Sequence, residues 1–328
     1  MKIIQVCPRY YPDIGGVETH VREISERLVK KDFEVEVIST DPKGRYQKEE
    51  TVNGVKVRRF RSIAPNDAYF FAPQIYFYLK KAICDLIHAH NYHALPALFA
   101  AFAKKNRKFI FTPHTFGFST SFPRKIFHRV YKPFGQFMYN AADKVVSVSK
   151  IEKEWLKNIF KVPENKLCYI PLPIDIGKTR EKKRKDGGDV KIAFIGRLSV
   201  EKNVDVLIEA FKLVKQNHSE CKLYIIGDGP LRKYLEGMSK HINDIIFIGR
   251  LVHDEILKFL DDIDIFVLPS QFEVSPMSVL EAMAKSVPVI ATPVGEIPYV
   301  LENGKIVLEG TGKEILENNH VKTAYLGI

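Results

Sequence analysis

Short apolar runs alternate with amphipathic stretches along the whole chain, in the order typical of parallel α/β proteins. The runs 2–7 and 191–195 are rich in β-branched residues without polar alternation, as expected for strands buried on both faces. Each run is followed by a glycine-containing loop and an amphipathic helix, at 17–30 and 203–215. Further strands are predicted at 34–39, 55–59, 86–89, 108–112, 144–148, 222–226, 245–248, 264–268 and 287–291, with helices at 95–105, 151–160, 230–240, 254–260 and 279–284.

The repeated strand–loop–helix start predicts two Rossmann-like domains. We place an N-terminal domain at 1–177, a basic linker at 178–189 and a C-terminal domain at 190–328. The linker has no apolar side chain over its length and carries a glycine pair near its end, as exposed connections do. Open parallel sheets bind ligands at the carboxyl ends of their strands, so we expect the functional site in a cleft between the two domains.

The length of 328 residues and the hydrophobic share of 45% fit two soluble domains and exclude a disordered or collagen-like chain. No apolar run approaches the roughly 18 residues that a membrane-spanning helix needs. The first apolar run is too short for a secretory signal, so we expect a cytoplasmic protein. The four cysteines lie far apart in the sequence, which predicts free thiols.

The net charge of +11 is confined to the first half of the chain. Residues 1–188 carry 35 Lys and Arg against 19 Asp and Glu, a net +16, whereas 189–328 carry 15 against 20, a net −5. Two segments of the first half, 69–81 and 116–139, mix aromatic with basic residues. Such segments form either an interfacial surface on anionic lipid or core-facing helices with snorkelling Lys and Arg. The charge points to an anionic or membrane-bound partner.

The second half contains five motif-like segments in a fixed order, and the first half adds four shorter ones. Together they resemble the family 4 retaining glycosyltransferases (glycosyltransferases group 1), whose GT-B fold has two Rossmann-like domains facing a central cleft. The segments are 194–203, 225–232, 247–250, 266–270 and 273–284, with 11–18, 87–90, 112–114 and 146–149. The resemblance implies a nucleotide-diphospho-sugar donor held by the C-terminal domain and an acceptor held by the N-terminal domain.

Two cations follow the 191–195 strand at the mouth of the next helix, and they suit a pyrophosphate. Arg197 can bind it with two parallel hydrogen bonds, and Lys202 acts as a point charge. The resemblance gives both the role of stabilising the departing nucleotide diphosphate. The alternative is that they are ordinary solvated charges at a helix entry.

Two carboxylates eight residues apart, Glu273 and Glu281, match the Glu-x7-Glu spacing of the family. The resemblance places Glu273 at the donor sugar and Glu281 at the ribose, and carboxylates suit vicinal diols because they only accept hydrogen bonds. A helix starting near Pro276 leaves unpaired N–H groups around Met277, Ser278 and Val279 for an anion. The family usually has glycine where Pro276 stands.

In the first half, Gly15 and Gly16 follow the first strand and let a phosphate or sugar approach the backbone. The resemblance places this pair at the donor phosphate and acceptor, and His114, after a predicted strand, near the donor sugar. His90 ends another strand on the acceptor side. Gly249, Arg250 and Leu251 resemble the part that lies against the nucleotide base.

We expect no metal ion and no cofactor. His88, His90 and His93 have a metal-like spacing, but two alternate along a strand and the third follows a turn. The Asp262–Asp264 pair is a formal Asp-x-Asp and is interpreted as a turn entering a strand. The family uses cations and helix starts at its leaving group instead of a metal.

The prediction is a retaining, metal-independent hexosyltransferase acting on a hydroxyl acceptor, either a lipid-linked or an anionic glycan, and lying either free in the cytoplasm or peripheral to the inner membrane face. The alternatives are a nucleotide-sugar epimerase or hydrolase, a non-catalytic donor-binding relic, and a basic nucleic-acid-binding protein; the last lacks a recognisable reading module. Nucleic acid is therefore not an expected partner. Family members continue beyond residue 307 to a helix that returns to the first domain, so we expect that crossover helix to be missing.

Overall fold

The computed structural model describes residues 1–13, 15–115, 122–172 and 189–301. Its internal contacts divide the chain into two compact units, Met1–Pro173 and Ile174–Ile328. The predicted linker, apart from Asp189, and the expected missing crossover helix lie outside the described residues. In the described part of the chain, no helix is both long enough and apolar enough to cross a membrane.

The N-terminal unit is an eight-stranded sheet with the order β3-β4-β2-β1-β5-β6-β7-β8. All neighbouring strands are parallel except the β3–β4 pair at one edge. The strands are β1 (Lys2–Val6), β2 (Glu34–Thr40), β3 (Glu49–Val52), β4 (Val55–Phe60), β5 (Leu86–His90), β6 (Lys108–Thr112), β7 (Lys144–Ser147) and β8 (Leu167–Tyr169).

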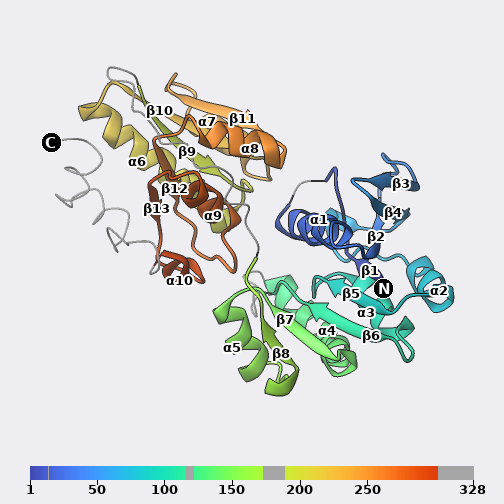
Figure 1. The fold of residues 1–328 in the computed structure, drawn as a ribbon. Helices are drawn as coiled ribbons and strands as arrows, with labels where there is room; N and C mark the ends of the chain where they lie inside the picture. Colours follow the sequence, from blue (N-terminus) through green and yellow to red (C-terminus); the bar gives the residue numbers. More distant parts are fainter. Residues whose placement is uncertain (14, 116–121, 173–188, 302–328) are drawn as a thin grey trace. The chain divides into compact units, whose positions relative to one another are not determined.

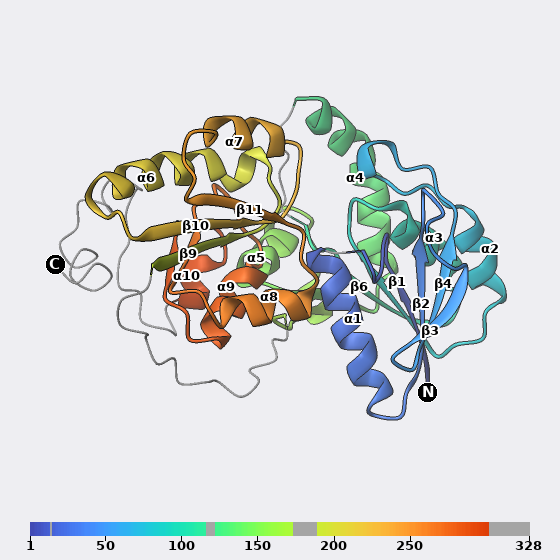
Figure 2. The ribbon, with the colours of Figure 1, turned by 90° about the horizontal axis from the view of Figure 1, so that it is seen from above.

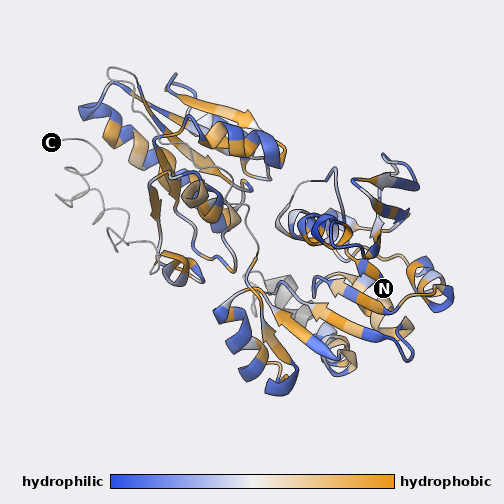
Figure 3. Ribbon diagram, viewed as in Figure 1, coloured by the Kyte–Doolittle hydropathy of each residue, from blue (hydrophilic) through white to orange (hydrophobic). Residues whose placement is uncertain are grey.

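Helices cover both faces of this sheet. Helix α1 packs beside β2 and β4 on one face, whereas α2 and α3 lie on the other, with α4 against α3 (Figures 1 and 2). The bounds are α1 (Gly16–Val29), α2 (Gln74–Lys81), α3 (Leu95–Ala103), α4 (Phe122–Ala141) and α5 (Lys150–Asn158), with short 3-10 turns at Pro65–Asp67 and Glu164–Lys166. Apolar residues concentrate on the strands, and the outer side of α1 is hydrophilic (Figure 3).

The C-terminal unit is an all-parallel sheet of five strands in the order β11-β10-β9-β12-β13. Helices α6 and α7 lie on one face and α8 and α9 on the other (Figure 2). The elements are β9 (Val190–Ile195), a 3-10 turn (Val200–Lys202), α6 (Val204–Asn217), β10 (Cys221–Ile226), α7 (Arg232–Met238), β11 (Ile245–Gly249), α8 (His253–Leu260), β12 (Ile265–Leu268), α9 (Met277–Ala284), β13 (Val289–Ala291) and α10 (Ile297–Leu301).

The predicted α/β class is confirmed, and most predicted elements lie within a few residues of their observed bounds. The strand order changes direction at β1, which lies between β2 and β5, and at β9, which lies between β10 and β12. Ligands of open parallel sheets bind at such reversal points. We therefore expect the functional residues in the loops after β1, β5 and β6 of the N-terminal unit and after β9, β11 and β12 of the C-terminal unit.

The four cysteines are free thiols, as predicted. The aromatic and basic segments divide between core and surface. Helix α2 buries Ile75 and Leu79 but leaves Phe77 63% exposed. Helix α4 buries Tyr131, Met138 and Tyr139 and exposes Phe134 and Phe137, whereas residues 116–121 lie outside the described part.

Candidate functional site

In the C-terminal unit, the loop after β9 carries both predicted phosphate cations. Arg197 is exposed, and Lys202 ends the 3-10 turn before α6. The Lys202 ammonium forms a short ion pair with the Glu273 carboxylate, which lies in the loop after the neighbouring strand β12. The backbone joins the same two loops, since Gln271 N–H donates to Glu201 O at 2.9 Å. Two residues 71 positions apart thus meet because β9 and β12 are adjacent.

Glu273 is a buried carboxylate, 6% exposed, and the structure gives it several partners. Besides Lys202, Ser270 Oγ donates to Glu273 Oε1 at 2.7 Å, and the Glu273 carbonyl accepts from Glu296 N–H at 3.2 Å. Gly295 has φ +59°, and a Cβ there would lie 1.6 Å from the Glu273 carbonyl oxygen. Only glycine fits this position. The loop that follows β13 therefore fixes the backbone of Glu273.

Glu281 lies in α9 and is 5% exposed, so it is not an ordinary solvated helix residue. Its Oε1 is 3.2 Å from His253 Nδ1 at the start of α8. Sequence reasoning missed His253; the only signal was its position two residues after the Gly249–Leu251 segment. The structure thus gives Glu281 an imidazole neighbour from a different loop.

The start of α9 differs from the prediction. Pro276 precedes the helix, which begins at Met277. Met277 N–H donates to Ser275 O at 2.9 Å and Val279 N–H donates to Pro276 O at 3.0 Å. The expectation of a run of unpaired N–H groups is therefore wrong for these two, because the proline turns the chain tightly enough to satisfy them locally. The N–H group of Ser278, which lies between these two residues, is the part of the predicted anion site to which this finding does not apply.

The predicted base-side residues lie at the end of β11. Gly249 has φ +88°, and Arg250 reaches Asp228 with 3.7 Å between Nε and Oδ2, both side chains being largely exposed. Leu251 is partly buried against the core of this unit. A Cβ on Gly227 would lie 1.8 Å from the Gly196 carbonyl oxygen. The glycines of the loop after β10 therefore serve close packing.

Asp264 confirms the interpretation of the Asp-x-Asp pair as a turn. Its Oδ2 accepts from Lys191 N–H at 2.9 Å, and its own N–H donates to the Lys191 carbonyl at 2.9 Å. These two bonds tie the start of β12 to β9. The carboxylate is used in joining strands.

In the N-terminal unit, Gly15 caps α1 and Gly16 begins it, one residue before the predicted start at Val17. A Cβ on Gly15 would lie 2.3 Å from Glu18 Oε2, whereas a Cβ on Gly16 would have no atom within 4 Å. Glu18 is buried and accepts from Arg9 Nε at 2.8 Å. Gly15 thus lies against the buried Glu18 carboxylate, and Gly16 borders open space.

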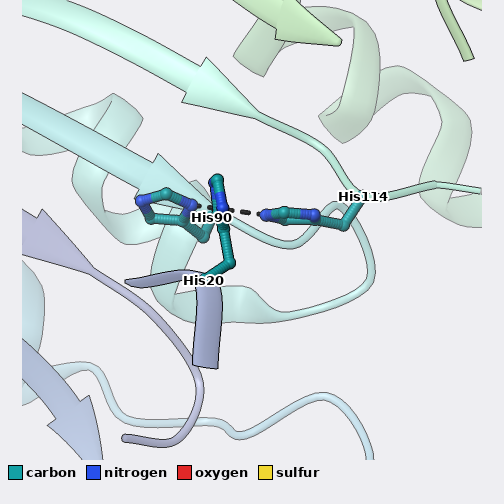
Figure 4. Close-up of side chains that lie close together, drawn as sticks. All are labelled: His20, His90 and His114. Atoms are coloured by element: carbon teal, nitrogen blue, oxygen red, sulfur yellow. Dashed lines mark hydrogen bonds between the residues drawn. The ribbon is translucent and has the colours of Figure 1, made fainter. Parts of the chain in front are cut away.

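Three histidines from separate segments meet at the carboxyl edge of this sheet. His90 ends β5, His114 follows β6 with φ +48°, and His20 projects from α1 (Figure 4). His90 Nδ1 is 3.4 Å from His114 Nε2, and His90 Nε2 is 2.8 Å from Gln5 Oε1 in β1. His90 is fully buried, His20 is 5% exposed and His114 is partly exposed. His20 was missed in the sequence, where it is one polar position of an amphipathic helix.

Burial keeps these rings neutral. It lowers the pKa of His20 to about 4. The pKa values of His90 and His114 lie well below the usual range, chiefly because of burial and secondarily because of the neighbouring imidazoles. A protonated ring would be a buried charge without a counter-ion. The cluster therefore offers neutral donors and acceptors at physiological pH.

The metal-like spacing of His88, His90 and His93 does not form a cluster. His88 Nε2 is 2.8 Å from Thr112 Oγ1 on β6, and His93 is exposed.

A buried glutamate holds the His114 loop in place. Glu152 of α5 accepts from Thr115 N–H at 2.7 Å and from Val148 N–H at 2.8 Å. Glu152 was also missed, because a buried glutamate in a helix is indistinguishable in sequence from a solvated one.

Both halves of the chain match known glycosyltransferase families. Residues 14–178 match the model of Glycosyltransferase Family 4, and residues 175–320 match that of Glycosyl transferases group 1. An uncharacterized glycosyltransferase of Methanocaldococcus jannaschii is 30% identical, the match covering 95% of this chain and 83% of that protein. The alpha-monoglucosyldiacylglycerol synthase of Acholeplasma laidlawii is 27% identical over 93% and 83%.

Among solved structures, Anabaena HepE in complex with UDP and glucose has a similar fold. Its TM-score is 0.76 at 17% identity, and the match covers 99% of this chain and 90% of that one. At this identity the likeness concerns the fold alone. It agrees with the arrangement of two parallel-sheet α/β units described above.

Proposed function

The chain belongs to family 4 of the glycosyltransferases, and from this premise we propose that it moves a hexose from a nucleotide-diphospho-sugar to a hydroxyl acceptor with retention of anomeric configuration. The observation that carries the proposal is the meeting of Lys202 and Glu273 at the reversal point of the C-terminal sheet. The pair sets a cation for a leaving phosphate beside an acceptor-only carboxylate for a sugar hydroxyl.

Catalysis is mainly electrostatic in this proposal. Arg197, Lys202 and the α9 start near Ser278 stabilise the negative charge that develops on the leaving pyrophosphate. Glu273, already fixed by Ser270 and the Gly295 loop, orients the sugar hydroxyls. Glu281 accepts from the ribose hydroxyls, and the Gly249–Leu251 segment lies at the base. Because these groups supply the charge stabilisation, transfer needs no metal ion.

The N-terminal unit serves the sugar and the acceptor. Glu152 holds the loop of His114 through its hydrogen bond to Thr115 N–H, and His114 contacts the donor sugar. Gly16 leaves room for the reacting groups. His90 and Gln5 support His114 from behind. A neutral imidazole can donate to or accept from a hydroxyl without attracting the donor phosphates away from Lys202.

The acceptor in this proposal is lipid-linked or anionic. Phe102 of α3 and Phe137 of α4 are stacked with ring centroids 4.6 Å apart, yet they remain 49% and 38% exposed. Exposed aromatic pairs on a basic domain fit the interface of an anionic membrane. The glucolipid synthase similarity is consistent with such an acceptor.

The experiment is a mass-spectrometric screen of UDP-, GDP- and ADP-hexoses with lipid extract as the acceptor source. We expect one donor to give a glycosylated product with the anomeric configuration of the donor, measured by NMR. Sugar release or epimerisation without acceptor would establish a hydrolase or epimerase instead. Loss of transfer in EDTA, restored by Mg²⁺ or Mn²⁺, would overturn metal independence.

A further inference from the structure

The cluster of His20, His90 and His114 has a property that sugar positioning does not require. One ring nitrogen from each histidine lies within 4.8 Å of one from each of the other two. The three come from α1, the end of β5 and the loop after β6, and their rings converge on one point (Figure 4). Three convergent imidazoles are a common protein ligand set for a transition-metal ion.

The spacing of two of the nitrogens already suits a tetrahedral ion. His90 Nδ1 and His114 Nε2 are 3.4 Å apart. Zinc binds imidazole nitrogen at about 2.0–2.1 Å, which places two ligands of a tetrahedral site roughly 3.4 Å from each other. The third ligand lies within 4.8 Å, so a small movement of the His20 ring completes the set. No rearrangement of the sheet is needed.

The tautomer of His90 is set for coordination. When Gln5 Oε1, which only accepts, takes this 2.8 Å contact, His90 Nε2 carries the proton. Its Nδ1 therefore presents a lone pair toward His114. Metal-binding histidines characteristically donate their second N–H to such an outer partner, which fixes both tautomer and ring orientation.

His20 adds an independent observation. Its Nδ1 is buried and has no hydrogen-bond partner among the residues that the structure describes. Buried polar atoms are seldom left unpaired, because desolvation without a partner costs free energy. The ring is 5% exposed and lies edge-on to His114, with centroids 5.1 Å apart. It is thus a buried imidazole aimed into the cluster.

We propose that His20, His90 and His114 form a binding site for Zn²⁺ or a similar ion such as Co²⁺. Imidazole ligands select these ions, whereas Mg²⁺ and Ca²⁺ prefer oxygen ligands. His114 is partly exposed, so the ion has an entry path and an open fourth position for water.

The bound ion is an inhibitor of transfer. This consequence rests on the proposed function, in which His114 contacts the donor sugar. An ion on His114 removes that nitrogen from the sugar, so ion and substrate compete. The ion is distinct from a catalytic metal, and EDTA is expected to leave transfer intact or to raise it.

The test is a titration of the EDTA-treated, desalted full chain with Co²⁺, followed by visible absorption. We expect one equivalent to give the intense bands of tetrahedral Co²⁺, displaced by Zn²⁺, and Zn²⁺ to raise the Tm. His20→Gln and His114→Gln remove a ligand and abolish the bands. Gln5→Leu removes the outer partner and weakens binding by about 10- to 100-fold. His93→Gln, an exposed histidine of the same unit, leaves the titration unchanged.

Circular dichroism of each metal-free variant checks folding, and the wild-type titration remains decisive if a buried variant fails to fold. Absence of tetrahedral bands in the wild type, or unchanged binding by folded His114→Gln, overturns the site. Tight binding without inhibition of transfer overturns the inhibitory role only. A chain that binds Co²⁺ as expected but transfers no sugar refutes the proposed function and leaves the site standing.

Discussion

The two parallel sheets carry opposite kinds of chemistry at the ends of their strands. The N-terminal sheet gathers neutral imidazoles, His20, His90 and His114, whose pKa values burial lowers. The C-terminal sheet gathers carboxylates with basic partners: Glu273 with Lys202, and Glu281 with His253. The architecture is shared, and the side chains at the strand ends decide what each unit does.

The net charge of each half does not match the charge of the groups at its strand ends. The half with a net charge of +16 has an uncharged cluster, and the half with −5 places a cation at its site. Surface charges dominate a net count, whereas buried groups keep a charge only when they are paired. An imidazole without a counter-ion becomes neutral instead. Net charge therefore informs about partners of the surface and not about the chemistry of the site.

Replacing the cation of the C-terminal pair should have the largest effect. We expect Lys202→Ala to lower kcat by about 100- to 1,000-fold, the usual cost of removing one preorganised group that stabilises developing charge. Initial rates with saturating donor measure it. Lys212→Ala, which breaks a surface pair with Glu209 on α6, is the control and should leave kcat unchanged. Near-normal kcat in Lys202→Ala would remove the proposed distinction between the two strand ends.

Acid should destabilise the N-terminal unit through its histidines. The folded pKa of His20 is lowered from 6.5 to about 4, so the unfolded chain binds the proton first as pH falls. Stability is thus complete above pH 6.5 and is lost between pH 6.5 and 4, by roughly 3 kcal/mol for this one group.

The single tryptophan, Trp155, lies in α5 and reports on this unit alone. Urea unfolding followed by its fluorescence, with chelator present, measures the pH dependence. His20→Gln should flatten part of the slope, whereas His241→Gln, an exposed residue of the other unit, should not. Stability independent of pH between 6.5 and 4 would contradict a buried neutral cluster.

Neutralising the second carboxylate should weaken donor binding more than catalysis. We expect Glu281→Gln to raise the donor KM by about 10-fold or more with little change in kcat, because a hydrogen bond to a charged group is lost in substrate and transition state alike. Steady-state kinetics separate the two. Glu236→Gln, at a surface pair with Arg232, should behave as wild type. A fall in kcat with unchanged KM would place Glu281 at the reacting centre instead.

The smallest effect concerns the aromatic surface of α3 and α4. The double change Phe102→Ser, Phe137→Ser should weaken sedimentation with phosphatidylglycerol vesicles by about threefold to tenfold, since each ring is only half available for burial. Phe77→Ser on α2 is the matched control, exposed but not a member of the stacked pair. Equal loss in both would show that exposed aromatic area, and no particular face, drives binding.

Local patterns were sufficient for most of the fold. Buried strands such as β1 and β9 are continuous apolar runs, and helices such as α1 and α6 show one apolar face, so period and turn signals identify them. The sequence pattern does not predict strand β3, because Glu-Glu-Thr-Val has no apolar period. The strand forms by pairing with β4 and through the ion pair of Glu49 with Arg58. Edge strands depend on their neighbours.

The sequence by itself determined the fold class, the family resemblance and the candidates Lys202, Glu273, Glu281 and His114. The tertiary structure alone decided which of them meet and with what partners. It brought Glu273 to Lys202, gave His253 to Glu281, and added His20 to His90 and His114, while His88 contacts Thr112 and His93 is exposed. The physical reason is that strand order is set by long-range packing. Residues far apart in sequence become neighbours only when their strands end side by side.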